Sequence, residues 1–171
     1  MKRRQVIKNV LFSTVGIISL PAWGNNWNIG ELSKSKSIFN ENEVQILDIL
    51  VDAMIPSSTI IGAKDIGTTA FINKMLSDCY EKDIQDNFKK GLIKSALLSN
   101  EKFGKSLSEC DNLQKTELLK NMSVSTDTAQ KDFFNFLKQL TVLAYTTSEY
   151  VLTNHYNYVM APGHYYGCVN V

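Results

Sequence analysis

The residues with the clearest capacity for chemistry lie near the C-terminus, where Ser148 and Glu149 precede His155 in one short stretch. A serine with a histidine and an acid could provide a nucleophile, its general base and an orienting group. A Ser-Glu pair is also typical of a helix start, where the hydroxyl caps the helix and the acid favours its positive end. These three residues have two interpretations. In the functional one, the chain is a stand-alone periplasmic hydrolase; in the structural one, Ser148 and Glu149 only cap a helix.

Metal binding is a second kind of chemistry, and its clustered candidates are His155, His164 and Cys168. They are spread along an expected irregular tail and do not have the spacing of metal ligands. The sequence also contains no CxxC, no HExxH and no glycine-rich phosphate loop. We expect no metal, nucleotide or flavin to bind to this chain.

The three cysteines leave several pairings open. Cys79 lies on an expected apolar helix face, Cys110 precedes a helix, and Cys168 lies near the C-terminus beside a glycine. An odd cysteine in an exported protein is either a free thiol or a partner in an intermolecular bridge. Cys168 could remain free, pair with Cys79 or Cys110, or form an intersubunit disulfide.

The first 24 residues have the pattern of a secretory signal peptide. A basic start is followed by the apolar run from Val10 to Leu20, and Pro21–Gly24 provides small residues suited to cleavage. Arg3 and Arg4 with the following residues resemble a twin-arginine signal, which would export a folded protein. An ordinary export signal that carries two arginines is the alternative, and both predict a periplasmic location.

Composition indicates one globular domain without a nucleic-acid partner. Hydrophobic residues make up 44% of the 171 residues and charged residues 20%. After the basic leader, seventeen acidic residues face fourteen basic ones. Nucleic-acid binding needs clustered Lys and Arg, which this distribution does not offer.

Hydrophobic spacing predicts an all-α fold, a compact bundle of about five helices over residues 39–171, after a flexible linker at 25–38. Asn40 with Glu43 is a capping box for a helix over Glu41–Ile55, which is apolar on most sides and therefore expected at the centre. A loop follows at 56–67. The expected caps of the later helices are Thr68, Asp111 with Gln114, and Thr126 or Thr128, and Asp83 is expected to start the third helix.

Periodicity also predicts which faces of these helices are buried. Gly91 within the third helix costs about 1 kcal/mol relative to Ala, which indicates a close contact between helices, and Gly104 is an expected C-cap. The expected buried residues are Phe71, Ile72, Met75, Leu76 and Cys79, then Ile84, Phe88, Leu92, Ala96 and Phe103, then Leu113, Leu118, Leu119 and Met122, and finally Phe133, Leu137, Leu140 and Ala144.

The last residues are rich in tyrosine and poor in aliphatic side chains. Six of the seven tyrosines lie between Tyr145 and Tyr166. Such a tail cannot form its own core, whereas aromatic side chains provide rigid contact area at an interface. Tyr145 is the one expected to belong to the core. The predicted partner-interface residues are Tyr150, Tyr156, Tyr158, Pro162, Tyr165 and Tyr166.

Several short stretches, in this order and spacing, resemble one known family. The chain is similar to gluconate 2-dehydrogenase subunit 3, the small subunit of membrane-associated flavin sugar dehydrogenases. Two positions depart from the family pattern: Ile61 stands where the family usually has proline, and Ala144 where glycine is common. The matching stretches are Leu47–Pro56, Gly62–Asp65, Phe71–Tyr80, Phe103–Ser106, Leu140–Glu149 and Pro162–Cys168.

The resemblance implies a non-catalytic accessory subunit. In such complexes a large glucose–methanol–choline-type subunit holds FAD and oxidises a sugar or sugar acid, and a haem c subunit often accepts the electrons. The small subunit provides the export signal and accompanies the large one. A cofactor-loaded enzyme has to fold before export, which gives a twin-arginine signal a physical reason. The implied partners are thus the FAD-containing subunit and a cytochrome c subunit, and any membrane association would come through the complex.

Overall fold

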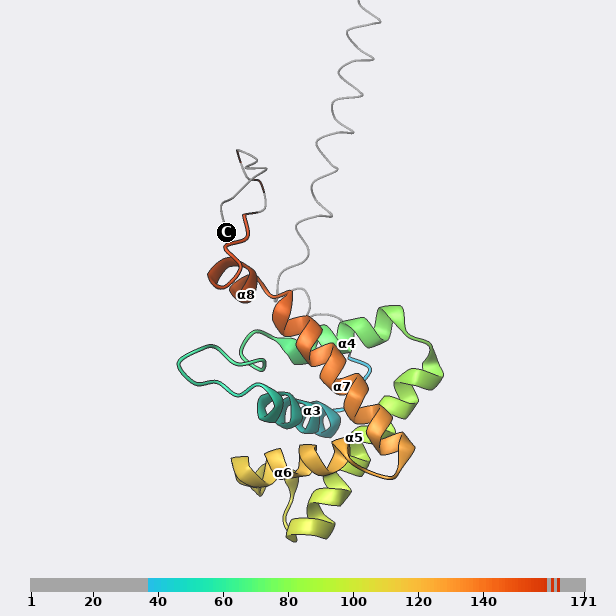
Figure 1. The fold of residues 1–171 in the computed structure, drawn as a ribbon. Helices are drawn as coiled ribbons and strands as arrows, with labels where there is room; N and C mark the ends of the chain where they lie inside the picture. Colours follow the sequence, from blue (N-terminus) through green and yellow to red (C-terminus); the bar gives the residue numbers. More distant parts are fainter. Residues whose placement is uncertain (1–36, 160, 162, 164–171) are drawn as a thin grey trace, which may run out of the picture. The chain divides into compact units, whose positions relative to one another are not determined.

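The computed structural model describes residues 37–159, 161 and 163, and these residues form an all-helical unit without a strand (Figure 1). The all-α prediction is confirmed for this part of the chain. Residues 37–159 contain six α-helices where about five were expected, because a short helix follows the long C-terminal one. The elements are α3 (Glu41–Met54), α4 (Thr68–Cys79), α5 (Lys82–Phe103), the 3-10 helix η2 (Leu107–Glu109), α6 (Asn112–Ser123), α7 (Thr128–Thr146) and α8 (Glu149–Asn154).

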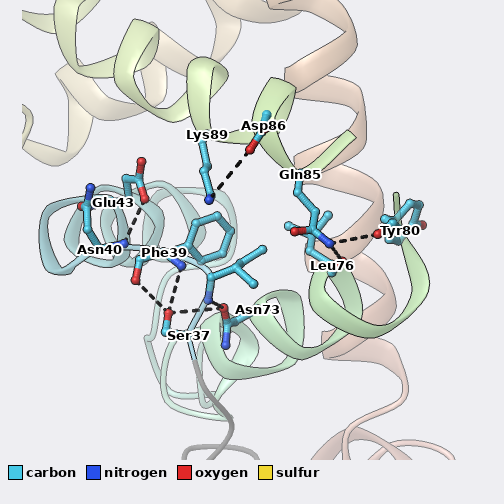
Figure 2. Close-up of polar contacts among 11 residues, drawn as sticks. Ser37, Phe39, Asn40, Glu43, Asn73, Leu76, Tyr80, Gln85, Asp86 and Lys89 are labelled. Atoms are coloured by element: carbon cyan, nitrogen blue, oxygen red, sulfur yellow. Dashed lines mark hydrogen bonds and ion pairs between the residues drawn. The ribbon is translucent and has the colours of Figure 1, made fainter. Parts of the chain in front are cut away.

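Helix α3 lies at the centre of the unit, as its nearly all-round apolar sequence predicts. Its N-terminus has the expected capping box: Glu43 N–H donates to Asn40 Oδ1 at 2.8 Å, and Asn40 N–H donates to Glu43 Oε2 at 2.9 Å (Figure 2). The helix contacts α4, α5, α6, α7 and η2. Leu47, Leu50 and Val51 are fully buried in these contacts.

The segment before α3 is fastened to α4. Ile38 N–H donates to Asn73 Oδ1 at 3.0 Å, and the Ser37 hydroxyl donates to the same oxygen at 3.3 Å (Figure 2). The Phe39 ring packs against Phe88 of α5 with ring centroids 5.9 Å apart. Ser37 and Ile38, which the sequence predicts to be the end of the linker, therefore contact the helical unit. The expected signal peptide at 1–24, including Arg3 and Arg4, lies outside the described residues.

Helix α4 differs from the prediction in its N-cap and in the exposure of Cys79. Its N-cap is Gly67, in a left-handed conformation with φ 82°, and not Thr68. Thr68 is the first helical residue, and its buried hydroxyl has no hydrogen-bond partner among the described residues. Ile72 and Leu76 are buried as expected, whereas Cys79 is exposed because the helix ends there.

The buried face of α5 is more polar than predicted. Phe88 and Leu92 are buried, but Ile84 is 41% exposed, Ala96 is half-buried, and Gln85, Ser95 and Ser99 are buried instead. Gln85 Nε2 donates to the carbonyls of Leu76 and Tyr80, both at 2.9 Å, so the buried amide group has hydrogen-bond partners (Figure 2). The start of the helix at Lys82 lies one residue before the expected Asp83.

Gly91 and Gly104 have the roles that the sequence indicates. A Cβ atom at Gly91 would lie 2.2 Å from a ring carbon of Phe133, so the glycine permits close packing of α5 against α7. Gly104 ends α5 in a left-handed conformation with φ 66°. Both positions therefore need glycine, the first for space and the second for conformation.

Helices α6 and α7 confirm most of their expected features. Asp111 N–H donates to Gln114 Oε1 at 3.0 Å at the start of α6, and the face of Phe133, Leu137, Leu140 and Ala144 on α7 is buried. Two expectations are wrong. Leu113 is 85% exposed, and the cap of α7 is Asp127, whose carboxylate accepts from Ala129 N–H at 3.0 Å. Neither Thr126 nor Thr128 has this role.

Candidate partner interface

The tyrosine-rich segment begins as ordered structure. Ser148 Oγ accepts from Val151 N–H at 3.3 Å and caps α8. After α8 the chain folds back, because Tyr158 N–H donates to the Leu152 carbonyl at 2.9 Å and Asn157 has a positive φ of 50°. This part of the expected irregular tail is thus a short capped helix followed by a hydrogen-bonded turn.

The structure exposes two of the predicted interface tyrosines. Tyr156 is 65% exposed and Tyr158 is 53% exposed, and the adjacent Val159 is 62% exposed. Tyr150 is half-buried, with its ring edge-on to His155 at a centroid separation of 5.9 Å. Pro162, Tyr165, Tyr166 and Cys168 lie outside the described residues.

A second exposed apolar feature was not predicted, and it lies in the loop between α3 and α4. Ile60 and Ile61 at its tip are each 43% exposed. The Tyr145 hydroxyl of α7 donates to the Ile61 carbonyl at 2.9 Å, which joins the loop to the C-terminal end of α7. Sequence reasoning treated residues 56–67 only as a connection, and the link depends on two residues 84 positions apart.

The structure does not join Ser148, Glu149 and His155 into a triad. The Ser148 hydroxyl donates to the Tyr145 carbonyl at 2.7 Å and accepts the capping bond, so both of its roles are structural. Among the described residues, no hydrogen bond connects His155 to Ser148 or Glu149, and the His155 ring packs on Tyr150. The capping interpretation of Ser148 is therefore confirmed.

Of the cysteines, the structure places Cys79 and Cys110. Neither forms a disulfide with another described residue. Cys110 is buried, with Sγ 3.1 Å from Ser99 Oγ, whereas Cys79 is exposed at the end of α4.

A hollow with a volume of about 590 Å³ lies between α5 and α7. Aromatic rings form its wall: Phe88 packs edge-on against Phe133 at 5.1 Å and against Phe136 at 5.8 Å, and Tyr80 packs against Phe136 at 5.1 Å. Its lining contains neither histidine nor cysteine. The chemistry it offers is apolar contact, with Lys90 and Lys94 at its edge.

Lys94 is paired with Asp127, the cap of α7. The hydrogen bond from Lys94 lowers the pKa of Asp127 below its ordinary value of 3.8, with smaller contributions from the Lys94 charge and from the backbone N–H groups of Ala129 and Gln130. The carboxylate therefore stays ionised at neutral pH. The ion pair holds the start of α7 against α5.

Neither a metal centre nor a membrane span is found in the part of the chain that the structure describes. No three His, Cys, Asp or Glu side chains come together there as a metal site requires. No helix at 37–159 combines the length and apolar content needed to cross a membrane.

The described helical unit exposes Tyr156 and Tyr158 after α8 and Ile60 and Ile61 in the loop between α3 and α4, and exposed apolar groups of this kind are typical of interaction surfaces. The sequence profile of gluconate 2-dehydrogenase subunit 3 matches residues 41–163, which include every helix described above. The chain belongs to this family, and the family name points to a subunit of a dehydrogenase complex. No curated protein and no solved structure matches it.

Proposed function

We propose that this chain is the non-catalytic small subunit of a periplasmic FAD-dependent sugar or sugar-acid dehydrogenase. In this role it escorts the large FAD-bearing subunit during export and stabilises or matures it. The observation that carries the proposal is the family match over residues 41–163, which covers all six helices and continues into the tyrosine-rich tail.

The geometry of the C-terminal end supports a protein partner. Tyr156 and Tyr158 expose more than half of their surface on a turn whose backbone is fixed by hydrogen bonds. A rigid aromatic side chain loses little entropy when a partner covers it, so such residues are favoured at interfaces. The partner surface continues, in this proposal, through Tyr150, Pro162, Tyr165 and Tyr166.

The cofactors of the complex belong to the other subunits. FAD is held by a large glucose–methanol–choline-type subunit, and haem c by a third subunit that receives the electrons. A flavoprotein that binds its cofactor in the cytoplasm has to be exported folded. The paired Arg3 and Arg4 in the leader of the small subunit supply a signal of the type that transports folded proteins.

The escort role is tested by expressing the large subunit in its native host with and without this chain. We expect export, flavin content and dehydrogenase activity of the large subunit all to require the chain. A large subunit that reaches the periplasm loaded with flavin and active in its absence would show that the escort role is wrong.

The export route is tested separately by replacing Arg3 and Arg4 with lysine. The substitutions keep the positive charge but remove the arginine pair, so we expect both subunits to remain in the cytoplasm. Subcellular fractionation with antibodies against each subunit measures the result. Normal export of both subunits would exclude the twin-arginine route and leave the subunit assignment in place.

A further inference from the structure

The loop between α3 and α4 has a fixed shape despite its length. Ser58 N–H donates to the Ile60 carbonyl at 3.0 Å, Gly62 N–H donates to Ser57 Oγ at 3.1 Å, and Ala63 N–H donates to the Ile55 carbonyl at 3.0 Å. At Gly62 a Cβ atom would lie 2.5 Å from Ser57 Oγ, so the loop closes on itself without room for a side chain. These bonds determine where the tip points.

Tyr145 braces this loop against α7. Its hydroxyl donates to the Ile61 carbonyl, and the Tyr145 carbonyl accepts from Ser148, the cap of α8. One residue thus contacts both the loop and the start of the tyrosine-bearing segment. Figure 1 shows the loop leaving α3 and returning to α4 in the region where α7 leads into α8.

Exposed apolar side chains gather in these connected segments. Twelve large hydrophobic residues are exposed in the described part of the chain, and seven of them lie in the loop, the last turns of α7 and the segment after α8. Single exposed hydrophobic residues are ordinary, but a concentration on braced backbone is typical of an interaction surface. The seven residues are Ile60, Ile61, Val142, Leu143, Tyr156, Tyr158 and Val159.

We propose that Ile60 and Ile61 form a second contact with the large FAD-bearing subunit, where they enter an apolar hollow beside the site that receives the tyrosines. The inference rests on the proposed function, because membership of the family makes the chain a subunit and continuity with the tyrosine segment selects the same partner. The loop is already rigid before binding, so little conformational entropy is lost when the isoleucines are covered. Tyr145 is a positioning residue for this contact.

The test uses the purified complex of the two subunits, with this chain labelled and then chased with an excess of unlabelled chain. We expect the double variant Ile60→Ser, Ile61→Ser to dissociate about 30-fold faster or more, because two interface side chains of this size each contribute roughly tenfold in affinity and such losses fall mainly on dissociation. Tyr145→Phe keeps the ring and loses the brace, so a smaller acceleration of a few-fold is expected.

Ile93→Ser is the matched control, since Ile93 is a 49% exposed isoleucine on α5. Its dissociation rate should stay within about twofold of the wild type. Circular dichroism checks that every variant is folded, which is expected for substitutions of exposed residues.

Three outcomes would overturn the inference, and they can be told apart. A double variant that dissociates at the wild-type rate excludes the loop contact and leaves the subunit assignment intact. The wild-type rate is also the result expected if the last residues of this chain, and not the partner, cover the isoleucines. An equally large effect of Ile93→Ser shows that the loop is not special. Failure of the wild-type chain to form any complex with the large subunit removes the proposed function as well.

Discussion

Gly91 determines how closely α5 and α7 approach each other. A Cβ atom there would lie 2.2 Å from the Phe133 ring, which is held in place by Phe88 at a centroid separation of 5.1 Å. We expect Gly91→Ala to lower the free energy of unfolding by up to about 2 kcal/mol, because overpacking typically costs ~1–3 kcal/mol and the better helix preference of Ala returns only ~1 kcal/mol. Urea unfolding followed by circular dichroism measures the change.

The control for Gly91 is a double-mutant cycle with Phe133→Leu. The smaller leucine leaves space for a methyl group, so Gly91→Ala should cost less in this background than in the wild type. Equal costs in the two backgrounds would show that the glycine does not act through Phe133.

The ion pair of Asp127 with Lys94 should make the stability of the fold depend on pH in the acid range. The hydrogen bond from Lys94 lowers the pKa of this carboxyl in the folded protein below the ordinary 3.8. The stabilisation is therefore present above pH 3.8 and is lost as the pH falls through the depressed folded value. In urea unfolding, we expect the midpoint of the wild type to fall more steeply in this acid range than that of Asp127→Asn, which keeps a capping oxygen but cannot ionise.

The effect should be small, since the pair is exposed and salt screens it. Asp132→Asn removes one negative charge from the same helix and serves as the control. Identical pH profiles for the wild type and Asp127→Asn would mean that the Lys94 pair contributes nothing in solution.

At the scale of elements, the capping box of α3 should matter more than its exposed position suggests, because α3 contacts every other long helix. Asn40→Ala removes the acceptor of Glu43 N–H and should lower the free energy of unfolding by about 1 kcal/mol. Thermal unfolding measures the loss. Asn42→Ala, two residues further on the same helix, lacks a capping role and should be neutral or slightly stabilising; a loss equal to that of Asn40→Ala would argue against the cap.

Helix starts could be predicted from sequence where one residue offers a cap and another completes it. Asn40 with Glu43 and Asp111 with Gln114 were predicted for this reason. At the start of α7, Thr126, Asp127 and Thr128 can all cap a helix, and only tertiary contact with Lys94 of α5 favours the aspartate. Sequence alone could not make that choice.

Buried faces were predicted well on α7 and poorly on α5. The apolar stripe of α7 is compatible with only one buried face. On α5, the predicted face containing Ile84 and the observed face containing Gln85 differ by only a small rotation of the helix about its axis. The observed rotation is favoured by Gln85, whose side chain donates to the carbonyls of Leu76 and Tyr80 outside α5, both at 2.9 Å. A pattern of hydrophobic spacing does not contain these bonds.

The candidate interface also contains one part that could be predicted from the sequence and one part that could not. The aromatic content of the C-terminal segment pointed to a partner surface, and Tyr156 and Tyr158 are indeed exposed. Ile60 and Ile61 could not be connected with it, because their position depends on a hydrogen bond to Tyr145 far along the chain. Contacts between distant residues of this kind become visible only in the folded chain.

For the whole molecule, these features form one account. Helix α3 organises the unit, α7 carries the central apolar face, and Tyr145 at the end of α7 connects a rigid loop with the tyrosine segment. The exposed tyrosines and isoleucines lie in segments that Tyr145 joins, and the name of the subunit 3 family points to other subunits of a dehydrogenase complex. The central claim is therefore that the chain exists in a stable complex with a flavin-bearing dehydrogenase subunit.

The most direct measurement is affinity purification of the tagged chain from its native host, with the flavin absorbance and dehydrogenase activity of the eluted fraction recorded. The account predicts a large flavin-containing protein in equal molar amount with the chain, together with sugar or sugar-acid dehydrogenase activity. Elution of the chain alone, while the large flavoprotein accumulates in active form in the same cells, would contradict it.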